Sequence, residues 1–221
     1  MDNKINLFLL LSHQFKEKGF SLYLVGGTVR DYLLGRPLSD MDLVTDATPF
    51  QMRSFITHAD YTFEKFGSVK LTYAGEKFDI TTLRKESGYK DSRHPLVVCF
   101  TKSLEEDVHR RDLTINALYM NDKLEVIDLV KGLYDLENKE LRTVGDPLIR
   151  VIEDPLRIIR IARFKIELYF HCNDNLTNIL KENAYLLNRL NKDKIKSEIR
   201  KSSKVPQLLK YLRELGIVID L

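Results

Sequence analysis

A chain of 221 residues is long enough for one large domain or two small ones. Its composition, 43% hydrophobic and 30% charged, is typical of a soluble globular protein and excludes a disordered chain. No apolar run reaches the roughly 18 residues that a membrane span needs, so we expect no membrane contact and a cytoplasmic location.

The net charge of +3 is small, but it is unevenly distributed. Residues 181–221 contain ten Lys or Arg and five Asp or Glu, a local net charge of +5. This basic section fits contact with a phosphate backbone, although a solvated helical face is the more common explanation. Cys99 and Cys172 are far apart and lack metal-site spacing, which indicates ordinary buried thiols in a reduced compartment.

Helices and strands are both predicted in the first two thirds of the chain. The patterns predict helices at 4–18, 28–34 and 49–57 and within 104–119, and strands at 21–25, 42–44, 68–73, 77–82 and 125–129. Thr48 is the predicted N-cap of the helix that begins at Pro49. Gly75 predicts a hairpin, and the polar segment 86–95 predicts a mobile loop.

After Gly145 every predicted element is helical, at about 148–169, 174–188, 192–202 and 205–215. The fold class is therefore α+β. Residues 1–145 form a domain with a mixed or antiparallel β-sheet and flanking helices, and residues 146–221 form an all-α segment.

A glycine pair, Gly26-Gly27, separates the first predicted strand from the helix that follows it. Such a pair lets backbone N–H groups approach a phosphate closely, and the start of a helix favours an anion. Arg30 lies one turn into the helix, where its guanidinium could reach the same anion. For the glycine pair alone, a simple turn without a phosphate is the more common explanation.

Two carboxylates, Asp40 and Asp42, are spaced i and i+2 at the second predicted strand. On a strand this spacing directs both side chains to one face. Adjacent like charges are costly unless a cation neutralises them, and a pair of Mg²⁺ ions would do so while promoting phosphoryl transfer. Asp79 is either a third carboxylate of this site or a solvent-facing strand residue.

Four ordered motifs between residues 22 and 164 resemble those of class II tRNA nucleotidyltransferases and bacterial poly(A) polymerases. LVGGTVRDYLLG (24–35) with SDMDLVT (39–45) resembles their active-site signature, and RRDLTINAL (110–118) resembles their second motif. Residues 128–135 resemble the third motif more loosely, and EDPLRIIRIARF (153–164) resembles the nucleotide-selecting motif. The resemblance implies a nucleotidyltransferase-type head followed by a helical neck.

The last motif places Asp154, Arg157, Arg160 and Arg163 at every third residue. On a helix these four side chains trace a slow spiral, opposite apolar residues that would pack on a core. Three arginines without interleaved glutamates repel one another, which suggests an anionic partner, although a solvated arginine face is the simpler interpretation.

The resemblance also implies residue roles. Asp40 and Asp42 would be the catalytic, metal-binding residues; the nucleotide-binding residues would be Gly27, Arg30, Arg111, Asp154, Arg157, Arg160 and Arg163. Asp154 and Arg157 would read the base edge, since a carboxylate accepts from the amino group of C or A and Arg donates to ring acceptors. Asp112 and Asn116, four residues apart on a predicted helix, would hydrogen-bond within the site, or Asn116 would serve as a cap.

The expected activity is Mg²⁺-dependent addition of C, A or both from CTP and ATP to the 3′ end of tRNA or another RNA. Because the resemblance covers only head and neck, we expect nucleotide selection to be intact and RNA binding to be weaker. The alternatives are a poly(A) polymerase-like enzyme, a catalytically silent RNA-binding derivative, and a toxin-like transferase that blocks tRNA ends.

Overall fold

The structure is a computed structural model that describes residues 3–39, 41–89 and 95–220. The chain forms two compact units. Unit 1 comprises residues 1–86, 97–111 and 116–132, and unit 2 comprises residues 87–96, 112–115 and 133–221. The domain boundary predicted at residue 145 remains a prediction. In the described ranges, no helix combines the length and hydrophobicity that crossing a membrane requires.

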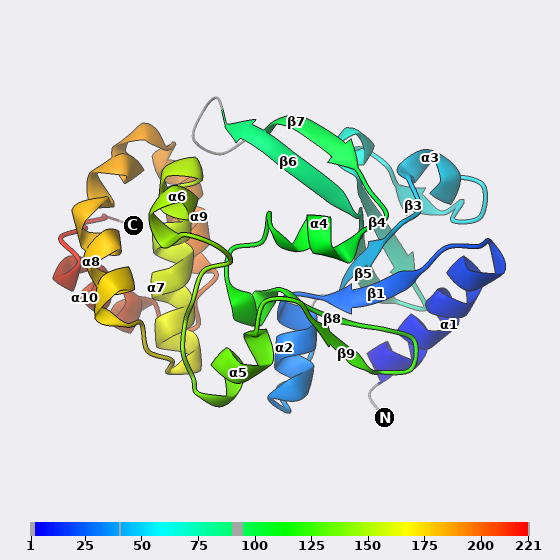
Figure 1. The fold of residues 1–221 in the computed structure, drawn as a ribbon, viewed down its shortest axis with the longest axis horizontal. Coiled ribbons are helices and arrows are strands. Elements are labelled where there is room, and N and C mark those ends of the chain that lie inside the picture. The colour runs from blue at the N-terminus through cyan, green and yellow to red at the C-terminus, as the bar shows by residue number, and fades with distance from the viewer. Residues whose placement is uncertain (1–2, 40, 90–94, 221) are drawn as a thin grey trace. The chain divides into compact units, whose positions relative to one another are not determined.

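A seven-stranded sheet forms the centre of unit 1, in the order β3-β4-β5-β2-β1-β8-β9 (Figure 1). The strands are β1 (Leu22–Val25), β2 (Met41–Thr45), β3 (Ala59–Asp60), β4 (Ser68–Tyr73), β5 (Glu76–Thr82), β8 (Leu118–Met120) and β9 (Val126–Asp128). Only β2 and β5 pair in parallel, and the other pairs are antiparallel. The predicted α+β class with a mixed sheet is confirmed.

The β4–β5 hairpin forms where the sequence predicts it. Ala74 and Gly75 both have positive φ, at 50° and 82°. This is the backbone pattern of a tight turn whose twist matches that of its flanking strands. The hairpin brings β5 into the sheet beside β2, and so places Asp79 next to the strand that carries Asp42.

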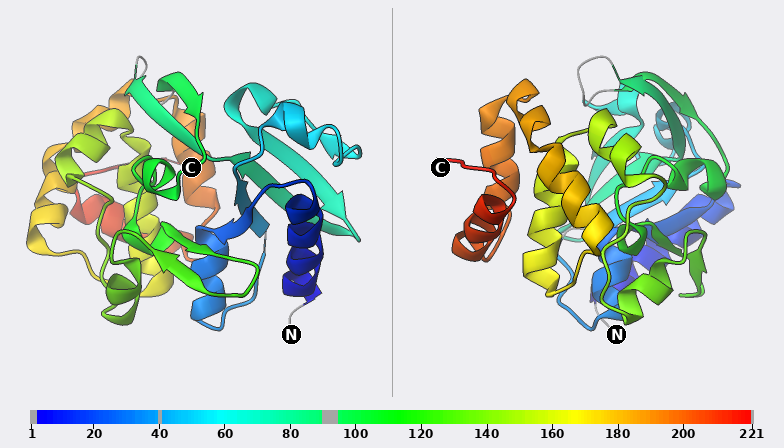
Figure 2. Two further views of the ribbon diagram at one scale, coloured as in Figure 1. Left: turned by 45° about the vertical axis from the view of Figure 1, so that its right-hand side comes forward. Right: turned by 60° about the vertical axis from the view of Figure 1, so that its left-hand side comes forward.

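Helices α1 (Asn3–Glu17), α2 (Gly27–Leu33), α3 (Pro49–Met52) and α4 (Leu104–Val108) belong to unit 1. In α1 the fully buried side chains Ile5, Phe8, Leu11 and Phe15 recur every three or four residues, which creates an apolar stripe. This helix contacts β1 (Figure 2). The predicted cap of α3 is confirmed, with Thr48 in a capping box and Pro49 at the first position, but the helix ends at Met52 rather than at residue 57.

The polar segment predicted to be a loop is in part a strand. β6 (Arg84–Tyr89) and β7 (Pro95–Phe100) form a separate two-stranded sheet, and residues 90–94 lie outside the described residues. Arg84 and Glu86 lie on one side of β6 and form an ion pair of 2.7 Å, which stabilises the extended backbone. Cys99 on β7 is exposed and Cys172 is half-buried, so the prediction of two buried thiols is wrong. A two-stranded ribbon leaves side chains such as Cys99 without a covering layer.

The helix predicted within 104–119 ends at Val108, and Asp112 and Asn116 do not share a helix. Tertiary hydrogen bonds replace the helical ones in this segment. The Thr114 amide donates to the Arg142 carbonyl at 2.9 Å, and the Val144 amide donates to the Asp112 carbonyl at 3.1 Å. Leu113 therefore forms an isolated bridge with Thr143 and a 3₁₀ helix begins at Thr114, an arrangement that local helical periodicity cannot anticipate.

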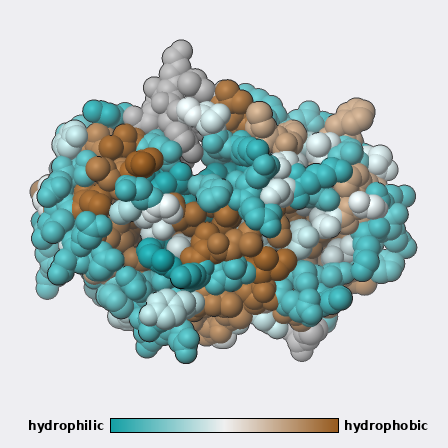
Figure 3. All heavy atoms as spheres, viewed as in Figure 1, coloured by the Kyte–Doolittle hydropathy of each residue, from teal (hydrophilic) through white to brown (hydrophobic). Residues whose placement is uncertain are grey.

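Unit 2 is helical, as predicted, apart from short extended segments. Its helices are α6 (Pro147–Glu153), α7 (Leu156–Leu168), α8 (Asp174–Glu182), α9 (Lys192–Arg200) and α10 (Val205–Glu214), with a 3₁₀ helix at Ala184–Arg189, while α5 (Gly132–Glu137) begins in unit 1. The single helix predicted at 148–169 is two helices, because Pro155 disfavours helical backbone at Asp154. Helices α7, α9 and α10 pack side by side (Figure 2). Apolar residues lie at the surface over α6 (Figure 3), among them Leu148, Ile149 and Ile152.

Candidate functional site

The glycine turn between β1 and α2 adopts a backbone conformation that favours glycine. Gly26 has φ 68° and ψ −132°, far from the regions that L-residues occupy. A Cβ atom at Gly26 would lie 3.9 Å from Asp42 Oδ2 and 4.0 Å from Arg111 Nη1. The turn therefore borders a carboxylate and a guanidinium that are 16 and 85 residues away in the sequence.

Asp42 projects from the face of β2 opposite its buried neighbours. Met41 and Leu43 are buried and Asp42 is exposed, as the alternation of a strand requires. The Asp42 amide donates to the Thr28 hydroxyl of α2 at 2.9 Å. This bond ties the start of α2 to the strand that carries the predicted catalytic carboxylate.

Asp79 on β5 is the direct parallel partner of Asp42 in the sheet. Partners in register project from the same face, so the two carboxylates are neighbours. The side chain of Asp79 is 43% exposed, and Lys70 Nζ lies 3.5 Å from its Oδ1. The sequence left the role of Asp79 undecided, and the strand register places it on the face of Asp42.

The predicted metal ligand Asp40 lies outside the described residues, so its side chain is not placed. In the described parts of the chain, no three His, Cys, Asp or Glu side chains cluster in a way that could hold a metal ion. The donors around Asp42 nevertheless suit Mg²⁺, because carboxylate oxygens are its preferred protein ligands. The exposed Asp42, with Asp79 beside it, is thus compatible with a divalent cation.

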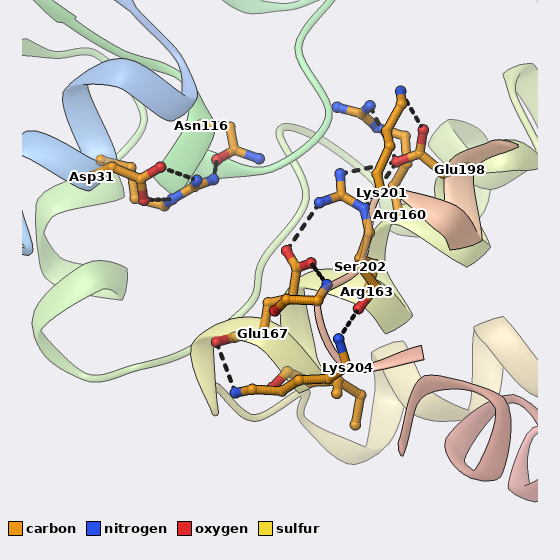
Figure 4. A network of polar contacts seen from close by, with 12 residues as sticks. Asp31, Asn116, Arg160, Arg163, Glu167, Glu198, Lys201, Ser202 and Lys204 are labelled. Carbon is orange, nitrogen blue, oxygen red and sulfur yellow. Dashed lines mark hydrogen bonds and ion pairs between the residues drawn. The ribbon is translucent and has the colours of Figure 1, made fainter. Parts of the chain in front are cut away.

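Arg30, predicted to reach an anion, is 7% exposed and is held by two residues of unit 1. Its Nε and Nη2 donate to Asp31 at 3.0 and 2.9 Å, and its Nη1 donates to Asn116 Oδ1 (Figure 4). A Cβ at Gly27 would lie 3.5 Å from Arg30 Nη2, an ordinary contact distance, so Arg30 packs directly against Gly27 without requiring a glycine there. Arg30 therefore joins α2 to the segment that leads into β8.

Arg111 is anchored by a residue that the sequence analysis missed. Asp107 on α4 is fully buried, and its Oδ2 accepts from Arg111 Nε at 3.1 Å and from Arg111 Nη2 at 2.8 Å. Burial alone would raise the Asp107 pKa, but Arg111 and Arg110 outweigh it and lower that pKa to about 2. Its position four residues before Arg111 was the only available signal, and a helical pairing at that spacing is common.

Asp154 and Arg157 lie in unit 2, at the break between α6 and α7. Asp154 Oδ1 accepts from the amide of Leu156, the first residue of α7, at 3.1 Å. Arg157 is 6% exposed, and its Nη1 donates to the Arg150 carbonyl at 3.0 Å and lies 3.3 Å from Glu153 Oε2. The two residues predicted to read the base are thus fixed by local contacts.

Arg160 and Arg163 are paired with acidic residues from elsewhere in unit 2. Arg160 Nη2 lies 2.6 Å from Asp112 Oδ2. Arg163 Nη2 lies 2.9 Å from Glu198 Oε1 (Figure 4). Arg163 is only 9% exposed. These arginines are therefore not bare, because Asp112 and Glu198 neutralise them from distant positions in the sequence. The anionic partner that the arginine spacing suggests remains a prediction.

Glu198 on α9 is the centre of this network. It is 3% exposed and also accepts from Lys201 Nζ at 2.8 Å. Burial would raise its pKa, but the hydrogen bond from Lys201 and the charges of Arg160 and Arg163 hold that pKa below its usual value. The network joins α7 to α9 and so fixes the helix that carries the nucleotide-selecting motif.

Comparison with known proteins gives one family. Residues 22–142 match the family model described as the poly A polymerase head domain. A CCA-adding enzyme of Ligilactobacillus salivarius is 43% identical over 190 residues, covering 86% of this chain and 47% of the relative. The chain thus spans about half the length of the curated relatives that it matches.

Two solved structures extend the match to the whole fold. The crystal structure of Bacillus stearothermophilus CCA-adding enzyme in complex with CTP is similar with a TM-score of 0.88 and 32% identity, over 98% of this chain and 53% of that chain. A second structure, of a tRNA nucleotidyltransferase complexed with a primer tRNA and an incoming ATP analog, is similar with a TM-score of 0.77 and 30% identity. The match covers 93% of this chain and 60% of that chain. The chain belongs to the poly A polymerase head domain family.

Proposed function

We propose that the chain adds C and A nucleotides to the 3′ end of tRNA, using CTP and ATP and no nucleic-acid template. The observation that carries this proposal is the meeting of Asp42 and Arg111 at Gly26. A carboxylate and a guanidinium at one glycine turn suit a metal-bound triphosphate, because one holds the cation and the other neutralises phosphate oxygens. The names of the relatives, CCA-adding enzymes, support the choice of reaction.

The residues that would hold Mg²⁺ are Asp40 and Asp42, with Asp79 as a neighbouring carboxylate. When bound, a pair of such ions activates the attacking 3′ oxygen and stabilises the leaving pyrophosphate. Gly26 and Gly27 leave room for the triphosphate beside the sheet, and Arg111 orients it. Arg30 stabilises the turn by donating a hydrogen bond to Asn116 Oδ1.

Selection of the base is proposed for Asp154 and Arg157. The carboxylate accepts from the exocyclic amino group of C or A, and the guanidinium donates to ring acceptors, a combination that G and U do not match. The contacts of Arg157 with Glu153 and Arg150 hold the guanidinium in one orientation. Arg160 and Arg163 would act on the nucleotide from within the Glu198 network, which fixes α7.

Extension of a tRNA that lacks its 3′ CCA, with Mg²⁺ and each nucleoside triphosphate supplied separately, tests the proposal. We expect use of CTP, of ATP on a primer that ends in CC, and neither GTP nor UTP, with all addition lost in Asp42→Ala. Equal use of all four triphosphates would contradict template-free selection. Long A tails on many RNAs would favour a poly(A) polymerase, and RNA binding without turnover would favour a silent derivative.

A further inference from the structure

Asp107 lies at the centre of the most deeply buried charged cluster near the glycine turn. It is 0% exposed, and both of its carboxylate oxygens accept hydrogen bonds. Oδ2 accepts from Arg111 and from the Tyr119 hydroxyl, the latter at 2.9 Å. Oδ1 accepts from the Arg84 amide at 3.1 Å and from Arg110 Nε at 2.8 Å. All these residues belong to unit 1.

The bonds from Arg111 to Asp107 determine which edge of the guanidinium faces the glycine turn. Nε and Nη2 are directed at Oδ2, and Nε also lies 3.0 Å from the Tyr119 hydroxyl. The remaining nitrogen, Nη1, lies on the side of Gly26 and Asp42. Because a guanidinium is planar, two bonds to one edge fix the direction of the third nitrogen.

We propose that Asp107 is a positioning residue for Arg111, which it holds with Nη1 toward the phosphates of the incoming nucleotide. This inference rests on the proposed function. Asp107 does not touch the nucleotide. It acts by neutralising and orienting a guanidinium whose side chain is only 11% exposed. Without this carboxylate, Arg111 would keep its charge but lose the bonds that fix its plane.

A purely structural role for Asp107 is the competing explanation, because its Oδ1 also holds Arg84 and Arg110. The two arginines separate the possibilities. Arg110 and Arg111 are neighbours in the sequence and both bind Asp107, with shortest distances of 2.8 Å for each. Arg111, and not Arg110, is among the three nearest neighbours of a Cβ atom placed on Gly26. Arg110 is therefore a matched control for the loss of a buried Asp107 partner.

The test is a pair of double-mutant cycles read by the dissociation constant of CTP in isothermal titration calorimetry. Asp107→Asn alone is expected to weaken CTP binding about tenfold, the size expected for one misplaced charged hydrogen bond. In an Arg111→Met background the same change should have less than about a twofold effect, and in an Arg110→Met background the full effect should remain. Additive effects with Arg111→Met, or loss of the effect with Arg110→Met, would overturn the inference.

Tyr119→Phe guards against a failure of Asp107→Asn to fold. It removes the hydroxyl that bridges Asp107 and Arg111 while preserving the ring, and we expect it to weaken CTP binding about two- to threefold. Unchanged affinity in this variant, together with an unfolded Asp107→Asn protein, would show a structural role only. A wild-type protein that binds no CTP would contradict the proposed function itself, whereas CTP binding with additive cycles contradicts only the role of Asp107.

Discussion

Asp42 of β2 and Asp79 of β5 are direct partners in the only parallel strand pair of the described seven-stranded sheet. The pairing follows from the order of the sheet, in which the β4–β5 hairpin adds β5 next to β2. Two carboxylates on one face repel each other in the absence of a cation. The register therefore places Asp79 beside the predicted catalytic carboxylate, on the same face of the sheet.

Substitution of these carboxylates should separate a required metal ligand from a supporting one. We expect Asp42→Asn to reduce nucleotide addition by more than about a thousandfold, and Asp79→Asn to reduce it about ten- to a hundredfold by weakening the cation site. Asp122→Asn, at a half-buried carboxylate that pairs with Lys16, is the control, and its rate of nucleotide addition should be unchanged. Primer extension against Mg²⁺ concentration provides the measurement. Full activity of Asp79→Asn at low Mg²⁺ would show that Asp79 is a solvent-facing strand residue.

Gly26 and Gly35 form a matched pair for testing the glycine turn. Both have positive φ, 68° and 64°, but a Cβ at Gly26 would border Asp42 and Arg111, whereas a Cβ at Gly35 would meet nothing within 4 Å. Each change to Ala should cost about 1–3 kcal/mol of unfolding free energy through backbone strain. Only Gly26→Ala should also raise the KM for CTP, by about tenfold or more. An equal KM for CTP in the two variants would contradict the assignment of the Gly26 turn to the nucleotide site.

Glu198 should contribute more to stability than any exposed acidic residue of unit 2. Glu198→Gln leaves the buried Arg163 with one fewer charged partner, and such a loss typically costs about 3–5 kcal/mol of unfolding free energy. Glu182→Gln, exposed at the end of α8, is the control and should change stability by less than about 0.5 kcal/mol. Chemical denaturation of both variants supplies the comparison. If the two curves coincide, the Glu198 network does not hold α7 to α9.

Asp107 should make the free energy of unfolding depend on pH in the acidic range. Its pKa is about 2 in the folded chain, below the ordinary aspartate value of 3.8, because Arg111 and Arg110 outweigh the effect of burial. The unfolded chain therefore binds more protons between these values, so stability is fully present above about pH 4 and is lost as the pH falls toward 2. The contribution is about 2 kcal/mol. Denaturation between pH 5 and 2.5 should show a shallower pH dependence in Asp107→Asn than in the wild type, and identical slopes would contradict the assigned pKa.

The sequence predicted the glycine turn and five of the seven strands of the described sheet because their signals are local, but it missed β3 and β8. Alternation identified β4 and β5, the glycine pair marked the exit from β1, and the spacing of Thr48 and Pro49 identified the start of α3. The helix predicted for the segment after α4 is wrong because the hydrogen bonds of that segment are long-range. Its backbone groups bond to residues 142–144, and no local pattern in 109–119 shows that partner.

The charged partners of the site were the largest omission. Arg163 and Glu198 are 35 residues apart, and Arg160 and Asp112 are 48 residues apart, so their pairing depends on how the helices pack. Asp107 lies close to Arg111 in the sequence, but its burial depends on β8 through Tyr119. The motif residues could therefore be named from sequence, together with Asp112 and Asn116 as hydrogen-bonding residues, whereas Asp107 and Glu198 could not.

Sequencing the products made from a tRNA that lacks its 3′ CCA tests the central claim most directly. The protein, Mg²⁺ and all four nucleoside triphosphates are incubated together, with Asp42→Ala as the blank. The account predicts additions composed of C followed by A, with no G or U, and no additions by the variant. Products with all four nucleotides in similar amounts, or extension that persists in Asp42→Ala, would contradict it.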